Sequence, residues 1–552
     1  MTLLLGPVLR HVAETTAMVW VQTDSPAEVT VLGSTARTFE VQGHHYALVA
    51  VQGLTPDSTT EYQVHLDGEQ VWPEPDSRFP PSVIRTRGPA TGQRLRVIFG
   101  SCRYPKTGDD RIDAKLGRDA LDCYAERMTT QPSERWPDVL ILLGDQVYAD
   151  ELTPDARQRL TGRRTNKKRP PDEVVSFDEY VGLYRHTWGD PEIRWVMSTL
   201  PTAMIFDDHD IRDDWNTSAA WRVAVNKKPW WRDRIRAGLA SYWVYQHIGN
   251  LSPQQLDEDV DYQQILSAGG DRWPLLADLA DRADREVDGE KGLRFSFRWD
   301  LGRSRLLMVD SRNARILDDG SRKMLGDREF GWVQRHVDDD LESLDHLILA
   351  TSLPWLLPPA IGDMQTVNEI AADRSGIRGV MAEKIRQAAD FEHWPAFSRS
   401  FLRFSELIEA AAGHAPRGPA TVSVLSGDVH HSYAARARFG GRPDVPDDSD
   451  ESDDHEARVH QLVCSPVHNY VPFYVKPVFR LGWSSWVARR ARRWARRHGA
   501  PDLPMSWRNL SGPLFGNTIA TLEITERHAG VVFEQPDDEG GLSAVSSIGL
   551  TD

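Results

Sequence analysis

The sequence has 552 residues, which is long enough for a large catalytic domain with an accessory domain beside it. It carries 65 Lys and Arg against 81 Asp and Glu, and the formal net charge of −16 argues against a general role in nucleic-acid binding. Three cysteines do not make a disulfide framework, and no stretch reaches the roughly 18 apolar residues of a membrane-spanning helix. The first residues lack the pattern of a signal peptide, so the chain as written is expected to be cytoplasmic.

Residues 1–90 are predicted to form a small β-sandwich. Short alternating runs at 16–21, 27–32, 46–51 and 61–66 are separated by turn residues, which is typical of antiparallel strands. The segment 54–62 resembles a signature of fibronectin type III domains, and this resemblance implies a tyrosine-corner role for Tyr62. The sandwich shows no obvious catalytic chemistry, so we expect it to pack against or position the rest of the chain.

Residues 91–552 are predicted to form the catalytic domain, after a linker at 88–92. The central stretch of this domain is Val139–Leu143, an unbroken apolar run that predicts a strand buried on both faces. A strand at 96–100 and a helix at 114–128 precede it, so the three elements are expected to form a βαβ unit.

Four predicted strands are followed directly by side chains that can bind metals. Asp145 and Tyr148 follow 139–143, Cys102 follows 96–100, Asp207, Asp208 and His209 follow 202–206, and Asp428 and His430 follow 421–425. Ligands of α/β sheets bind at the carboxyl ends of strands, so we expect these side chains to meet at one sheet edge. Such mixed O, N and S donors suit hard or intermediate metals, and a carboxylate shared by two cations is the arrangement used in two-metal phosphoryl chemistry.

The rest of the chain adds further predicted elements. Helices are expected over 215–247 and 326–344, and strands at 293–300, 304–310, 346–353, 517–525 and 529–535. The acidic segment 444–456 has the composition of a disordered loop. The basic segment 161–171 is either a solvated surface loop or a positively charged lid beside an anionic substrate.

The order of these motifs resembles one enzyme family. SCR, GDxxY, DDHD and SGDVHHS, with DSRN and LGDxExxW before the last, match the alkaline phosphatase D (PhoD-like) branch of the calcineurin-like metallophosphoesterases. The resemblance implies a four-layer α/β/β/α sandwich behind the small β domain. It implies hydrolysis of phosphomonoesters, phosphodiesters or both by a metal-activated hydroxide. The implied cofactors are ferric iron and one or more divalent cations, with calcium first and manganese, zinc or magnesium as alternatives.

The resemblance also assigns roles to residues. Asp145 would bridge the metals and share the catalytic work with His209 as the acid, while Tyr148, Cys102 and His430 would bind iron and Asp428 the divalent ion. Asp208 stands at a ligand position of the wider superfamily, with Asp207 as a second candidate. Cys102 could instead be an inert buried thiol. Arg103 and Arg312 could hold a phosphate oxygen, or each could be the partner of a structural ion pair.

Several alternatives stay open at this point. The same motifs are compatible with a nucleotide pyrophosphatase, or with a catalytically silent binding protein. The substrate is expected to be a small phosphoester or a phospholipid-like molecule. Residues 479–498 carry seven Arg with several Trp, which predicts either contact with an anionic membrane or a packed helix whose arginines pair with acids. Family members commonly carry a twin-arginine leader, and such a leader before residue 1 would place the protein in the periplasm or outside the cell.

Overall fold

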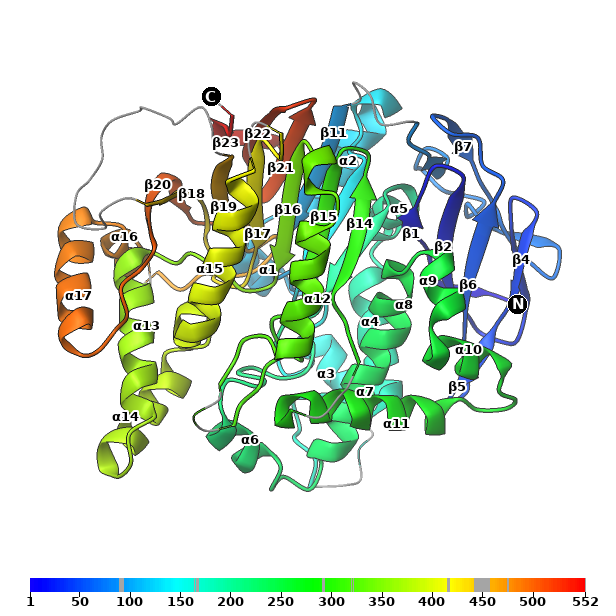
Figure 1. Cartoon of the computed structure of the whole chain (residues 1–552). Coiled ribbons are helices and arrows are strands. Elements are labelled where there is room, and N and C mark those ends of the chain that lie inside the picture. The colour runs from blue at the N-terminus through cyan, green and yellow to red at the C-terminus, as the bar shows by residue number, and fades with distance from the viewer. Residues whose placement is uncertain are drawn as a thin grey trace.

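The computed structural model describes residues 1–88, 94–162, 164, 168–289, 293–318, 320, 322–414, 417–440, 457–473 and 476–551. The predicted acidic loop 444–456 and most of the predicted linker at 88–92 lie outside these residues. Figure 1 shows a large mixed α/β body with the N-terminal strands gathered at one end of it.

The N-terminal strands form an antiparallel sandwich. One sheet has the order β1-β2-β6-β5 and the other the order β4-β3-β8-β9, while β7 and β10 pair separately. The strands are β1 (Leu3–Val12), β2 (Thr16–Thr23), β3 (Glu28–Val31), β4 (Ser34–Arg37), β5 (Phe39–Val41), β6 (His44–Gln52), β7 (Thr59–Glu61), β8 (Val64–Leu66), β9 (Glu69–Trp72) and β10 (Val83–Arg85). Alternating apolar residues of both sheets, Val19 and Val29 among them, fill a common core.

The sandwich is held against the catalytic domain by buried hydrogen bonds. The Trp20 indole donates to the Val244 carbonyl at 2.9 Å. The Tyr62 hydroxyl donates to the Ser198 carbonyl at 2.6 Å. The tyrosine-corner assignment for Tyr62 is therefore wrong, because that bond would return to the sandwich itself. Tyr62 instead fastens one domain to the other.

Two sheets form the body of the catalytic domain. The six-stranded sheet has the order β13-β12-β11-β21-β22-β23, and the seven-stranded sheet has the order β14-β15-β16-β17-β19-β18-β20. Their strands are β11 (Arg94–Gly100), β12 (Val139–Leu143), β13 (Thr202–Ile205), β14 (Phe297–Leu301), β15 (Ser304–Val309), β16 (His346–Thr351), β17 (Thr421–Ser426), β18 (Ser432–Phe439), β19 (Arg458–Val463), β20 (Met505–Leu514), β21 (Ile519–Thr525), β22 (His528–Pro536) and β23 (Leu542–Gly549).

The residues that the structure describes also form α-helices between these strands. They are α1 (Asp110–Leu116), α2 (Ala120–Thr130), α3 (Pro154–Thr161), α4 (Phe177–Trp188), α5 (Pro191–Thr199), α6 (Ala219–Val225), α7 (Trp231–Tyr242), α8 (Ile248–Asn250), α9 (Pro253–Glu258), α10 (Val260–Ser267), α11 (Trp273–Asp284), α12 (Asp327–Asp338), α13 (Pro359–Ala372), α14 (Ile377–Ala388), α15 (Ser398–Ala412), α16 (Lys476–Gly482) and α17 (Ser485–Arg497). None of the helices in the described part of the chain is long and apolar enough to cross a membrane.

The side chains of β15 show how the layers stack. Leu306 and Met308 belong to the core shared with the six-stranded sheet, whereas Leu307 and Val309 belong to the core shared with α12 and α15. Successive strand residues point to opposite faces, so the seven-stranded sheet is buried on both sides. Helix α2 packs on the outer face of the six-stranded sheet through Leu121 and its neighbours. The predicted four-layer α/β/β/α sandwich is confirmed.

Two predicted helices are interrupted. The predicted helix at 114–128 divides into α1 and α2, because Gly117 has a φ of 77° and Asp119 caps a new helix through its carboxylate. The predicted helix at 215–247 begins only at Ala219, and residues Trp243–His247 form a π-helical turn. The predicted strand pair at the C-terminus is present as β21 and β22, and β23 extends it.

Candidate metal centre

The predicted ligands lie at the carboxyl ends of strands from both sheets. Strands β11, β12 and β13 are parallel neighbours in the six-stranded sheet, whereas β17 belongs to the seven-stranded sheet. The expectation of a single sheet edge was therefore wrong. The centre forms where the ends of two packed sheets face each other, so ligands from either sheet reach the same space.

Cys102, Asp145 and His430 form the first cluster, with ligand atoms within 4.8 Å of one another. The Ser465 hydroxyl donates to the Cys102 sulfur at 3.3 Å, and the Ser101 hydroxyl lies 3.2 Å from it. Burial and the charge of Asp145 raise the pKa of the Cys102 thiol well above its usual value. A cation at this point would reverse that effect, because a coordinating thiol loses its proton.

Asp145, Asp207 and Asp208 form the second cluster, again within 4.8 Å. Asp145 belongs to both clusters, so it occupies the position of a shared ligand. Burial and the charge of Asp208 raise the pKa of Asp145 well above the ordinary carboxyl value. Asp145 Oδ1 and Asp207 Oδ2 are buried and accept no hydrogen bond from any described residue. Buried carboxylate oxygens left without donors fit bound cations, and this donor set suits them.

The backbone presents several of these ligands in an uncommon conformation. Cys102, Asp145, Asp428 and His430 have positive φ angles of 57°, 52°, 68° and 49°. Non-glycine residues rarely adopt this left-handed region, and such strain concentrates at functional sites. At the end of a strand this conformation turns the chain sharply, which brings the side chain into the space between the sheets.

The rings of Tyr148 and His209 pack against each other beside the clusters, with centroids 4.8 Å apart and planes tilted by 34°. The Asn469 amide donates to the Tyr148 hydroxyl at 2.9 Å. His209 Nδ1 lies 2.9 Å from an Asp150 carboxylate oxygen. Burial alone would lower the pKa of His209, but the charge and hydrogen bond of Asp150 raise it well above its ordinary value.

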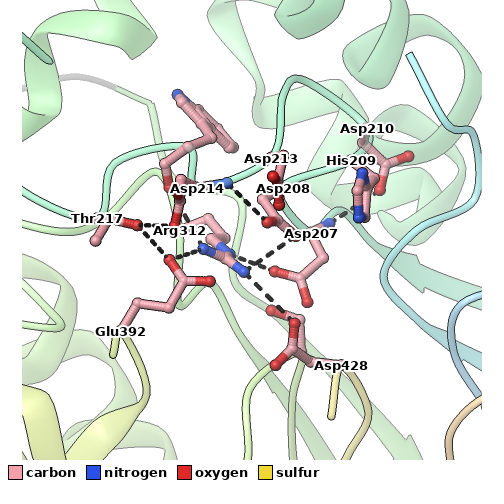
Figure 2. Close-up of polar contacts among 12 residues, drawn as sticks. Asp207, Asp208, His209, Asp210, Asp213, Asp214, Thr217, Arg312, Glu392 and Asp428 are labelled. Carbon is pink, nitrogen blue, oxygen red and sulfur yellow. Dashed lines mark hydrogen bonds and ion pairs between the residues drawn. The ribbon is translucent and has the colours of Figure 1, made fainter. Parts of the chain in front are cut away.

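Arg312 stands at the centre of a buried ion-pair network (Figure 2). Its guanidinium contacts Asp207 and Glu392 directly and lies 3.1 Å from Asp208 and 3.7 Å from Asp428. Burial alone would raise the pKa of Glu392, but the guanidinium charges of Arg312 and Arg315 hold it well below the usual value. Of the two predicted uses of Arg312, this geometry favours the structural ion pair, because its donors already face carboxylates.

Arg103 lies in a comparable network at another place. Its guanidinium is 2.7 Å from Asp119 and 3.5 Å from Asp122, and it donates to the Thr187 carbonyl at 3.0 Å. These partners are buried and belong to none of the metal-ligand clusters. The ion-pair alternative is therefore favoured for Arg103 too.

Asp428 has a partner that the sequence did not indicate. His393 Nε2 lies 2.8 Å from Asp428 Oδ2, and His393 Nδ1 lies 2.9 Å from the Gln365 side-chain amide. Burial alone would raise the pKa of Asp428, but His393 and Arg312 hold it below the usual value. His393 thus keeps Asp428 anionic and fixes its orientation.

Sequence reasoning missed five residues of this site: Asp150, Asp213, Glu392, His393 and Asn469. Asp213 forms a third cluster with Asp208 and His209, again with ligand atoms within 4.8 Å of one another. Asp150 and Asp213 lie close in sequence to Tyr148 and His209, so their proximity gave some signal. Glu392, His393 and Asn469 come from irregular segments that follow α14 or β19, where no strand-end pattern marks them. Cys123, by contrast, is a buried helical residue as predicted.

The chain is similar to a phosphatase family and to two solved structures. The model of the family described as PhoD-like phosphatase matches residues 121–492, and a domain of unknown function (DUF7800) matches residues 1–84. A solved structure of PhoD is similar over 99% of this chain and 92% of its own, with 13% identity and a TM-score of 0.54. The structure of purple acid phosphatase PPD1 from seeds of yellow lupin (Lupinus luteus) is similar over 98% of this chain and 73% of its own, with 10% identity and a TM-score of 0.49. No curated protein matched the chain.

The close packing of the second cluster generates a prediction about Gly144. A Cβ at this residue would lie 2.5 Å from the Cβ of Asp207, and Gly144 has a φ of +107°. Gly376 has a comparable φ of +84° but open space around its added Cβ. Both alanine variants carry roughly 1–2 kcal/mol of backbone strain, and overpacking adds ~1–3 kcal/mol for Gly144→Ala alone. Urea denaturation of the two variants measures the difference, and equal unfolding free energies would contradict this account of the cluster.

Proposed function

The chain belongs to the PhoD-like phosphatase family and is a metal-dependent phosphoester hydrolase, and we propose that it hydrolyses phosphomonoesters, phosphodiesters or both at a centre of ferric iron and one or more divalent cations. The observation that carries the proposal is the shared position of Asp145. Its carboxylate lies among a thiol and an imidazole on one side and two further carboxylates on the other.

The two sides differ in the metal that they suit. Cys102, His430 and the neighbouring Tyr148 phenol supply S, N and phenolic O donors, a mixed set suited to iron. Asp207, Asp208 and Asp428 supply carboxylate oxygens, which suit a hard divalent ion such as calcium, or manganese or magnesium. Zinc is a further alternative there. Asp207 and Asp208 both remain proposed ligands, because each has a carboxylate oxygen close to Asp145.

The protein's own residues then divide the remaining work. Bound cations would supply Lewis acidity and an acidified water for attack on phosphorus. Asp145 would hold both cations at a fixed spacing. Arg312 would keep Asp207, Asp208 and Asp428 in place by balancing their charge. His209 would donate a proton to the leaving oxygen.

The placement of His209 supports this last role. Asp150 fixes Nδ1, and Nε2 has no hydrogen-bond partner among the described residues, so it is available to a substrate. The ring also packs against Tyr148, which restricts its rotation.

The alternative of a silent binding protein is disfavoured, because every predicted ligand is present. A nucleotide pyrophosphatase would use the same centre and is distinguished by testing diphosphate substrates against simple esters.

The iron assignment predicts a visible colour. A phenolate bound to ferric iron produces a charge-transfer band, so we expect the purified protein to absorb visible light. Tyr148→Phe should bleach the band while the protein stays folded. Tyr104→Phe is the matched control, because Tyr104 packs edge-on against Tyr148 at 5.1 Å and is not a proposed ligand. An active wild-type protein that is colourless and free of iron would overturn the assignment.

The acid role of His209 predicts a dependence on the leaving group. An alkoxide needs a proton as it departs, whereas nitrophenolate is stable as an anion. His209→Ala should therefore lower kcat/KM for an alkyl phosphoester by ~10²–10⁴-fold, with a much smaller loss for a nitrophenyl ester. Asp150→Asn should show the same selectivity to a lesser degree.

Metal content is measured in both variants alongside the rates. Equal losses on the two esters would mean that His209 orients the substrate or binds metal instead of protonating. Loss of a metal ion in His209→Ala would identify the imidazole as a ligand.

A further inference from the structure

Residues 470–473 and 476–498, here called the arm, expose an unusual number of large apolar side chains. Leu481 is 60% exposed and Trp486 is 56% exposed. Tyr470, Val478 and Trp494 are exposed as well. Soluble proteins commonly expose single apolar residues, but a series of them on consecutive helices marks an interaction surface.

The arm is also strongly basic. Arg492 pairs with Asp363 at 2.8 Å and Arg496 with Asp502 at 2.9 Å, so the packed-helix alternative holds for these two. Arg480, Arg490, Arg493 and Arg497 are exposed. Among the residues that the structure describes, no carboxylate lies within ion-pair distance of these four. Their charge is therefore available to an outside partner.

The exposed face of α17 combines both properties. Trp486, Arg490, Arg493 and Arg497 follow at intervals of four, three and four residues, which places them on one side of the helix. The opposite side carries the buried Arg492 and Ala495. The Arg490 guanidinium lies 4.1 Å above the Trp486 ring. Tryptophan interleaved with arginine suits the headgroup level of a membrane, where apolar rings and cationic groups are both satisfied.

The arm adjoins the metal centre. The Phe479 ring packs on the His431 ring with their centroids 4.0 Å apart, and His431 follows the proposed ligand His430. Tyr470 follows Asn469, which contacts Tyr148. Figure 1 shows α16 and α17 beside α13 and α14 on one side of the molecule. Helix α14, which precedes Glu392 and His393, exposes a second apolar face with Ile377, Val380, Met381 and Ile385.

We propose that the arm docks on the surface of an anionic phospholipid bilayer. The protein as a whole carries a charge of −16 and would be repelled, so binding has to come from a local basic face. Nucleic acid explains the arginines but leaves the exposed Leu481 and Val478 without partners. A neutral apolar partner leaves the arginines without counter-charges. An interface that is both anionic and apolar satisfies the exposed arginines and the exposed apolar side chains together. Docking there holds the metal centre close to the membrane surface.

The test is co-sedimentation of the full chain with vesicles of phosphatidylcholine alone and with added phosphatidylglycerol. We expect binding to the anionic vesicles only, and weaker binding as salt increases. Each basic residue near an anionic surface contributes roughly fivefold, and each Arg→Glu change removes a positive charge and adds a negative one. The variant Arg490→Glu, Arg493→Glu, Arg497→Glu should therefore bind at least about a hundredfold more weakly. Trp486→Ala with Leu481→Ala should also weaken binding, through the apolar part of the contact.

A matched control carries the same charge change elsewhere. The variant Arg37→Glu, Lys227→Glu, Lys228→Glu alters exposed residues in β4 and between α6 and α7, and it should bind nearly as the wild type does.

Equal binding of the wild type to neutral and anionic vesicles, or no effect of the arm variant, would overturn the proposal. A dimer in gel filtration that the arm variant disrupts would assign the face to a second copy instead. Hydrolysis of a soluble nitrophenyl ester, measured in parallel, stays unchanged in all variants and tests the catalytic proposal separately.

Discussion

The structure depends most on the crowding of carboxylates around Asp145. Asp145, Asp207, Asp208 and Glu392 are buried close together, with the partly exposed Asp428 beside them, and burying such charges costs several kcal/mol each unless they are balanced. Arg312 and Arg315 supply part of the balance, on the side of Glu392. Asp145 Oδ1 and Asp207 Oδ2 remain without donors on the other side. Bound cations would complete the balance there, so the stability of this region and its chemistry would have the same origin.

The fold supplies this crowding through strand ends with strained backbones. Parallel strands from two sheets end at the same level, and left-handed residues such as Asp145 and His430 then turn their side chains into the gap between the sheets. Gly144 and Gly427 permit the close approach, because a Cβ at either residue would collide with Asp207 or with Ser101. The small β domain contributes no ligand. It packs on the helices behind β13 through contacts such as the one from Trp20 to Val244.

Much of this could be predicted from local patterns. The apolar run at Val139–Leu143 is strand β12 with the same bounds. The polar residues that follow it belong to the site, because the carboxyl end of the strand faces the centre. Local patterns fail where partners are distant in sequence. They could not divide the strands between two sheets, and they could not place Glu392 on Arg312 or His393 on Asp428, since those contacts join irregular segments. The break at Gly117 was missed because the helical spacing of apolar residues continues across it, although the helix itself ends there.

The most direct test of the shared-ligand geometry is elemental analysis of the wild type beside Asp145→Ala and His430→Ala, with phosphoester hydrolysis measured on the same samples. Asp145 belongs to both clusters and His430 to one of them. If Asp145 is the shared ligand, the wild type contains iron and a second cation, Asp145→Ala loses both together with activity, and His430→Ala loses mainly the iron. An Asp145→Ala protein that keeps both metals and near-normal turnover would contradict this role of Asp145.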